Sequence, residues 1–300
     1  MFPGKQQAYI GIGGGSDCVQ AAILAILSGN PACVISIRRN KLGSQTAKDD
    51  VGGKRTVENH GGEVGGAGSN IFRITPETTG SGRFLEFLPA YHLPTYLVID
   101  SQDGKLTDQI QTVLDDFGAA DTVIAIDTGG DALYRTEQAE DVVGKTTPDQ
   151  DISSLLAISK LKGPRLYSGI VAKGVDTPPY ADDILKAAEA RYVTLSDAQI
   201  ETVLGLYEMF ELDGSNPDRY GKTPFAWQAA LKGQTGQVRI PLPDHAVNHP
   251  TNPWNPIVNV DADTAGIYVM ELPKHVAAIS QTPPSPGLGQ SPGAERHYDI

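Results

Sequence analysis

The sequence has few of the features that mark secreted, membrane-bound or disulfide-stabilised proteins. Its 300 residues include only two cysteines, Cys18 and Cys33, so a disulfide framework is excluded and a reducing compartment is expected. No segment approaches the ~20 apolar residues of a membrane span, and residues 1–7 lack the apolar run of a signal peptide. We therefore expect a cytoplasmic protein that neither enters a membrane nor is exported.

Basic residues are also scarce. Lys and Arg number 24 against 36 Asp and Glu, which gives a formal net charge of −12. A nucleic-acid-binding surface normally needs a clustered basic face, so we expect a small-molecule partner and no nucleic acid. No G-x-x-x-x-G-K-S/T phosphate loop and no zinc-spaced cysteine pair is present either. The sequence leaves room for a homo-oligomer.

What the chain does contain is an alternation of apolar runs and amphipathic stretches. Residues 8–12 and 32–37 are strand-like, and the stretch between them is apolar almost all round, as in a buried helix. Strand, helix and strand within about thirty residues form a βαβ unit. The same rhythm predicts further strands at 71–74, 95–99, 122–126, 166–171, 238–242 and 266–270, and helices that begin near 106, 181, 196 and 223.

These elements predict a Rossmann-like α/β fold, a doubly wound and mostly parallel sheet with helices on both faces. We expect a single domain over residues 1–280 and a tail rich in Pro, Gly and Ser over 281–300. Residues 41–70 are polar and rich in glycine, without an apolar period. Loops of that length are most often lids or binding segments, so we expect this one to close over a ligand.

The first motif with chemical meaning is a glycine loop between the first strand and the first helix. Glycines at this position let backbone N–H groups and the helix N-terminus approach an anionic ligand. The loop is half of a dinucleotide fingerprint, and an arginine follows the second strand, where it could pair with a 2′-phosphate. A turn needed only for packing is the alternative. The predicted ligand-binding residues are Gly13, Gly14, Gly15, Ser16, Asp17 and Arg38.

Two further loops place aspartates after predicted strands. Asp127 and Asp131 flank a Gly-Gly pair after the strand 122–126, and Asp176 follows the strand 166–171. Carboxylates at the carboxyl ends of parallel strands face the crevice where open α/β sheets bind ligands. They can hold Mg²⁺ or bind sugar hydroxyls, although Asp127 could instead cap the next helix. We predict Asp127, Asp131 and Asp176 as catalytic residues, with Asp131 and Asp127 as metal ligands, and one pocket lined by all three loops.

The order of these motifs resembles that of a prokaryotic protein family known as domain of unknown function 1152. The likeness runs through residues 9–17, 127–131, Thr147-Pro148 with Asp151, 174–176, Thr223 and 233–240. This coverage, roughly residues 9–276, implies a single Rossmann-like domain and carries no particular reaction with it. Thr177-Pro178 stands in this chain where the family tends to have Gly-Glu.

Together these features lead us to expect an enzyme, a transferase or hydrolase with a carboxylate-based site. Its substrate would be a nucleotide, a phosphorylated compound or another small polar molecule, and its candidate cofactors are Mg²⁺ and a nucleotide. Two alternatives stay open, an NADP-dependent oxidoreductase and a non-catalytic small-ligand-binding accessory protein. Binding of NADPH would favour the first, and a bound ligand that is recovered unchanged would favour the second.

Overall fold

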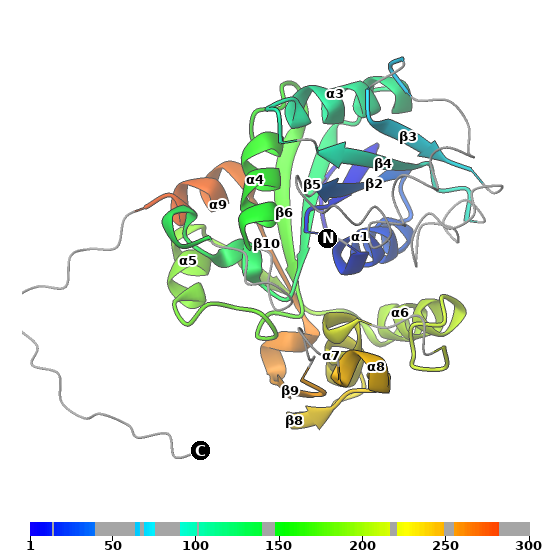
Figure 1. Ribbon diagram of the computed structural model, residues 1–300, viewed down its shortest axis with the longest axis vertical. Coiled ribbons are helices and arrows are strands. Elements are labelled where there is room, and N and C mark those ends of the chain that lie inside the picture. Colours follow the sequence, from blue (N-terminus) through cyan, green and yellow to red (C-terminus); the bar gives the residue numbers. More distant parts are fainter. Residues whose placement is uncertain are drawn as a thin grey trace, which may run out of the picture.

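A computed structural model describes residues 1–13, 15–39, 64–66, 69–75, 91–100, 102–139, 148–216, 221–248 and 255–281 (Figure 1). Within these ranges eight strands form one sheet in the order β3-β4-β2-β1-β5-β6-β10-β7. The strands are β1 (Gln7–Gly11), β2 (Ala32–Arg39), β3 (Ile71–Ile74), β4 (Thr95–Asp100), β5 (Thr122–Thr128), β6 (Arg165–Val171), β7 (Arg191–Val193) and β10 (Ile267–Glu271). The five strands β4, β2, β1, β5 and β6 run parallel, whereas β3 and β10 are antiparallel to their neighbours.

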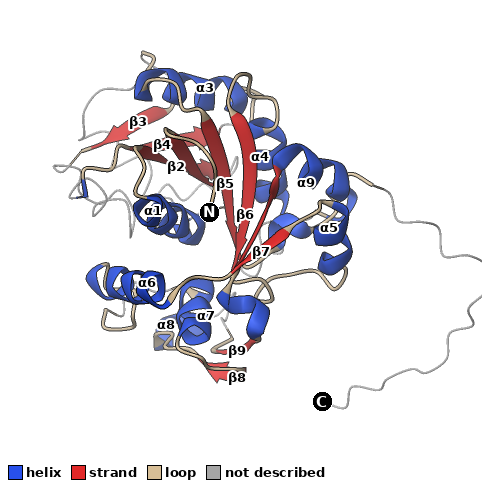
Figure 2. Cartoon of the chain, turned by 180° about the vertical axis from the view of Figure 1, so that it is seen from behind, coloured by secondary structure: helices blue, strands red, loops and turns tan. Residues whose placement is uncertain are grey.

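Helices cover both faces of this sheet (Figures 1 and 2). Side chains alternate along the strands, so Ala8 and Ile10 enter one hydrophobic core and Tyr9 enters the other. The first core is completed by α3 (Leu106–Phe117), α4 (Pro148–Ile158), α5 (Ala181–Ala187) and α9 (Leu272–Ile279). The second is completed by α1 (Gly15–Ser28), α6 (Asp197–Met209) and α7 (Lys222–Leu231). The protein is therefore an α/β protein with a mostly parallel mixed sheet.

The chain changes direction across the sheet at β1. It passes from β1 to β2 and then to β4 on one side, and it returns to form β5 and β6 on the other side of β1. The carboxyl ends of β1 and β5 consequently lie next to each other while their connections diverge. In open α/β sheets this reversal point is where a crevice forms and where ligands bind.

A smaller sheet packs outside the main one. It pairs β8 (Gly236–Arg239) with β9 (Ile257–Val260) and shares a separate apolar core with α7, to which Phe225, Ile240 and Val258 contribute. Between β8 and β9 lies the short helix α8 (Asp244–Val247). The strand predicted at 238–242 therefore begins two residues earlier than expected, and it is not part of the main sheet.

The capping signals predict one helix start correctly and another imperfectly. Ser196 and Gln199 form the expected capping box at the start of α6, each side chain bonding to the backbone of the other residue. Helix α7 begins at Lys222, with Gly221 before it, rather than at Thr223. Pro224 still falls within the first turn, where its missing N–H costs no hydrogen bond.

Some of the expectations fall on other parts of the chain. Gly14, most of the glycine-rich segment 41–70 and residues 282–300 lie outside the described residues. None of the helices that the structure describes is long and apolar enough to cross a membrane. Cys18 and Cys33 are buried and free, as expected for thiols without a disulfide.

Candidate functional site

The three aspartate-bearing loops follow three neighbouring strands of the sheet. Strands β1, β5 and β6 are adjacent and parallel, and Gly11 of β1 lies opposite Ile126 of β5. The residues that follow Gly11 therefore lie beside Asp127. This register brings the loops after all three strands to one edge of the sheet.

Asp17 lies in the first turn of α1 and folds back over the glycine loop. Its carboxylate accepts a hydrogen bond from the backbone N–H of Gly13. A side chain at position 13 has no room, because a Cβ there would lie 1.9 Å from Oδ1 of Asp151 and 2.6 Å from Oδ2 of Asp17. The Gly13 amide, expected to bind an anionic ligand, thus binds a carboxylate of the protein itself.

Asp127 is the penultimate residue of β5 and is 1% exposed. Neither of its carboxylate oxygens has a hydrogen-bond partner within the described part of the chain. Asp127 is not the N-cap residue of the next helix, although the backbone N–H of Ala132 in that helix partly opposes the rise in the Asp127 pKa. The following 3₁₀ helix, η2 (Asp131–Leu133), is preceded by Gly130 in a left-handed conformation, and no side chain caps it.

Asp151 comes from α4, on the other side of the glycine loop. Two contacts hold this helix against the ends of β1 and β2: Ser154 Oγ donates to the Ile12 carbonyl at 2.9 Å, and Arg39 forms an ion pair with Asp149. Asp151 is 1% exposed, and its Oδ1 has no hydrogen-bond partner among the residues described. Sequence analysis did not select Asp151 as a site residue. The signal that could have found it is the motif of Thr147-Pro148 with Asp151, which is named above only as part of the family resemblance.

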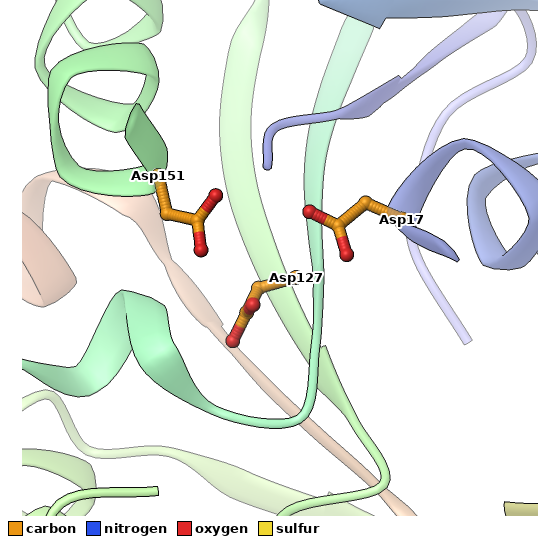
Figure 3. A group of neighbouring side chains, drawn as sticks. All are labelled: Asp17, Asp127 and Asp151. Carbon is orange, nitrogen blue, oxygen red and sulfur yellow. The ribbon is translucent and has the colours of Figure 1, made fainter. Parts of the chain in front are cut away.

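Together Asp17, Asp127 and Asp151 form a compact buried group, referred to below as the carboxylate cluster. One oxygen from each lies within 4.8 Å of those from the other two, and Figure 3 shows the three side chains converging from β5, α1 and α4. No lysine or arginine of the described chain forms an ion pair with them. The cluster has the donor set and spacing to hold a metal ion.

The electrostatics of the carboxylate cluster follow from its burial. Burial raises the pKa of Asp17, Asp127 and Asp151 well above the usual range, because the charged form of each loses its hydration. The negative charge of nearby Asp131 raises the pKa of all three further. Carboxyl groups with strongly raised pKa values are typical of functional sites.

Asp131 adjoins the carboxylate cluster without being one of its three members. It is the first residue of η2 and is 7% exposed. The predicted metal pair was Asp127 with Asp131, whereas the group that could share an ion combines Asp127 with Asp17 and Asp151. Asp131 also raises the pKa of Asp176, so its charge acts on both sides of the site.

A buried histidine holds the η2 segment in place. His275 Nε2 lies 3.1 Å from the carbonyl oxygen of Ala132, and its Nδ1 lies 2.9 Å from Ser168 Oγ. Because a carbonyl only accepts, Nε2 carries the proton and Nδ1 accepts from Ser168. Burial lowers the pKa of His275 to about 4, which keeps the ring neutral. Sequence analysis missed His275, since a lone histidine in a late helix gives no signal.

Asp176 lies on the far side of η2 and has a cationic partner. Its Oδ1 is 2.6 Å from Nζ of Lys222, the first residue of α7. Burial raises the pKa of Asp176, although Lys222 opposes that shift. Sequence analysis missed Lys222, since a single lysine just before the Thr223-Pro224 helix start gives no signal of its own.

The loop after β6 is also bonded to the loop after β5. Thr177 Oγ1 and the Asp176 amide both donate to the Gly129 carbonyl, at 2.7 and 3.1 Å. A Cβ at position 130 would lie 2.3 Å from Thr177 Oγ1, so glycine is needed there. These bonds fix Asp176 relative to Asp131.

The remaining predicted residues lie around this centre. Ser16 is half-buried in the first turn of α1, where it faces Gly221 at the start of α7, and Gly15 is the first residue of α1. Arg38 is half-buried near the end of β2 and forms no ion pair with the carboxylate cluster. The neighbouring Arg39 donates from Nη1 to the carboxylate of Asp149 and from Nη2 to the Asp149 backbone carbonyl. The structure therefore brings the aspartates together and leaves Arg38 outside the cluster.

Comparisons of this chain with protein-family models, with curated proteins and with solved structures find no match. The resemblance to domain of unknown function 1152 stays a prediction.

Proposed function

We propose that the protein is an enzyme that acts on a small phosphorylated or nucleotide substrate by group transfer or hydrolysis. The observation that carries this proposal is the carboxylate cluster, three buried acids that lack a cationic partner in the described chain. A buried acid without a partner costs free energy whether it stays charged or takes up a proton, so a merely structural role gives no reason to keep three of them together. Binding of an external partner during function would explain why the three acids are kept together.

The place of the cluster in the sheet supports the same proposal. The order β4-β2-β1-β5-β6 with its reversal at β1 fits the Rossmann-like, doubly wound sheet that we propose. Asp17, in the helix that follows β1, and Asp127, in β5, lie on the two sides of the reversal, where such sheets bind ligands.

The other charged groups fit distinct roles toward such a substrate. Asp131 would accept the proton of the attacking hydroxyl or water, because it lies beside the cluster and also acts on Asp176. Asp176, whose pKa is raised, would serve as the proton donor to the leaving group. Lys222 would pair with an anionic group of the substrate in exchange for Asp176.

The NADP-dependent alternative has less support. A dinucleotide places its pyrophosphate at the helix N-terminus after β1. There the carboxylate of Asp17 already accepts a hydrogen bond from the Gly13 amide, which a pyrophosphate would otherwise use. Arg39 is held by Asp149, which leaves it committed to packing α4. The non-catalytic alternative differs from ours only in what happens to the bound molecule.

The decisive experiment begins with the ligand. Small molecules released from the purified protein would be identified by mass spectrometry, and these compounds with a panel of nucleotides and sugar phosphates would be incubated with fresh protein. We expect phosphate release or transfer from one class of substrate. Quantitative recovery of a tightly bound compound would contradict the proposal and favour the accessory protein. Saturable NADPH fluorescence with hydride transfer would favour the oxidoreductase.

A further inference from the structure

The carboxylate cluster contains acceptor atoms that the described chain does not use. Both carboxylate oxygens of Asp127 and Oδ1 of Asp151 are buried without a hydrogen-bond partner. Buried polar atoms are nearly always satisfied, so three such atoms in one place are unusual. These atoms belong to side chains that lie close together (Figure 3), since one oxygen of each ligand residue is within 4.8 Å of those of the other two.

We propose that Asp17, Asp127 and Asp151 bind one divalent cation of the Mg²⁺ and Mn²⁺ class, each through a carboxylate oxygen. This inference rests on the site of the proposed function and adds the cofactor that the site takes. The ligand set differs from the Asp127–Asp131 pair expected from the sequence, because it recruits α1 and α4 on either side of β5.

The spacing and the chemistry of the donors fit this class of ion. Two oxygens on opposite sides of Mg²⁺ lie about 4.2 Å apart, since each Mg–O bond is about 2.1 Å. The three ligand oxygens already lie within 4.8 Å of one another, so small side-chain adjustments suffice. Donors that are all carboxylate oxygens suit hard cations, whereas zinc sites usually include nitrogen or sulfur.

The surrounding structure holds the three ligands before any ion arrives. The Gly13 amide orients Asp17, and the absence of a Cβ at Gly13 lets Asp151 approach. Asp127 is fixed by its place in β5, which is paired on both sides. Because the ligands come from three separate elements that pack on one another, an ion would join α1, β5 and α4 at the crevice.

A shared proton is the other way to stabilise neighbouring carboxyl groups. It would lie between Asp131 and Asp127 or Asp151, because carboxyl–carboxyl contact with Asp131 raises the pKa of both acids, and Asp131 is not one of the three proposed ligands. A cation at the centre would contact the oxygens without requiring them to contact each other. It would also remove the repulsion that an anionic substrate meets from three acids.

The test is Mn²⁺ binding to the full chain after dialysis against EDTA and then metal-free buffer. We expect electron paramagnetic resonance to show one bound Mn²⁺ per chain that excess Mg²⁺ displaces. Asp127→Asn and Asp151→Asn should each weaken binding at least 100-fold. The matched control is Asp182→Asn, which removes an exposed acid that pairs with Lys173 outside the cluster and should leave Mn²⁺ affinity unchanged.

The outcomes separate this inference from the proposed function. No binding at millimolar Mn²⁺, or equal affinity in all four proteins, would overturn the cation site. Thermal melts in EDTA check that each variant is folded, and the wild-type titration alone decides whether an ion binds. Turnover that persists in EDTA would uphold the enzyme and reject the cation, whereas Mn²⁺ binding without turnover of any substrate would do the reverse.

Discussion

The charged residues at the carboxyl ends of β5 and β6 differ in whether they form ion pairs. After β6, Nζ of Lys173 lies 2.7 Å from Oδ1 of Asp182 and 3.2 Å from Oδ2 of Asp263. In the same loop, Oδ1 of Asp176 lies 2.6 Å from Nζ of Lys222. At the end of β5, Asp127 shares its surroundings with two more acids and no cation of the described chain pairs with them. The two strands are hydrogen-bonded neighbours, so the fold alone does not dictate the difference.

This contrast separates charge that stabilises the fold from charge that is kept for a ligand. Removing one partner of an internal ion pair destabilises the fold, because the other charged group remains buried and unpaired. An acid without a partner loses nothing electrostatically when its charge is removed, and its neighbours gain. Substitutions at the ends of the two strands should therefore have opposite effects on stability and on turnover.

The largest expected effect is on turnover at the β5 end. Asp131→Asn should lower kcat by roughly 10²- to 10⁴-fold, as loss of a general base does, while the melting temperature changes little. The measurement is steady-state kinetics with the identified substrate beside a thermal melt. Asp182→Asn near the end of β6 is the control and should retain wild-type turnover. Near wild-type kcat in Asp131→Asn would remove Asp131 from the mechanism.

The next effect concerns His275, which joins the two strands by linking Ser168 of β6 to η2 after β5. Its pKa of about 4 lies below the unfolded value of 6.5, so the neutral form stabilises the fold above pH 6.5 and that stability is lost toward pH 4. The loss should reach about 2 kcal/mol between pH 7 and pH 5.

Urea unfolding of wild type and His275→Gln at both pH values tests this prediction. The buried carboxyl groups titrate in both proteins, so their contribution cancels in the comparison. The free-energy difference between the two proteins should shrink by about 2 kcal/mol at the lower pH. A pH-independent difference would show that the ring does not remain neutral in the folded protein.

The third prediction breaks an internal pair. Lys222→Met should lower the free energy of unfolding by about 1 to 2 kcal/mol, less than for a fully buried pair because the Lys222 side chain is 28% exposed. Adding Asp176→Asn should recover most of that loss, since no unpaired charge remains. Chemical denaturation of wild type, both single variants and the double variant gives the free energies of unfolding for a double-mutant cycle. A double variant less stable than Lys222→Met would contradict the pairing.

Sequence patterns predict the fold well for a physical reason. The strands of the parallel sheet are buried on both faces, so each is a continuous apolar run that is bounded by turn residues. A short, exposed edge strand leaves no such trace: Arg191–Val193 is three residues long and mostly exposed, and sequence analysis did not identify it. The element β8 was placed two residues late because its residues are largely exposed.

The candidate site was only partly predictable. The glycines and aspartates after β1, β5 and β6 are local features, and strand pairing brings them together as expected. Asp151 reaches the cluster because α4 packs over the glycine loop through Ser154, a contact between residues 142 positions apart. Lys222 and His275 likewise act across long separations in the chain. Such contacts depend on tertiary packing, so no spacing in the sequence reveals them.

The smallest expected effect tests most directly the difference between the unpaired acids at the end of β5 and the ion pairs after β6. In EDTA at pH 8, Asp127→Asn should leave stability unchanged or raise it by up to about 1 kcal/mol, because it removes one of three clustered buried acids. Millimolar Mg²⁺ should raise the melting temperature of wild type and leave Asp127→Asn unaffected, since only wild type has the ligand. Asp263→Asn is the matched change beside β6, where it should destabilise slightly by removing a partner of Lys173. If Asp127→Asn is clearly less stable than wild type in EDTA, Asp127 stabilises the fold as the β6 charges do, and the distinction between the two strand ends fails.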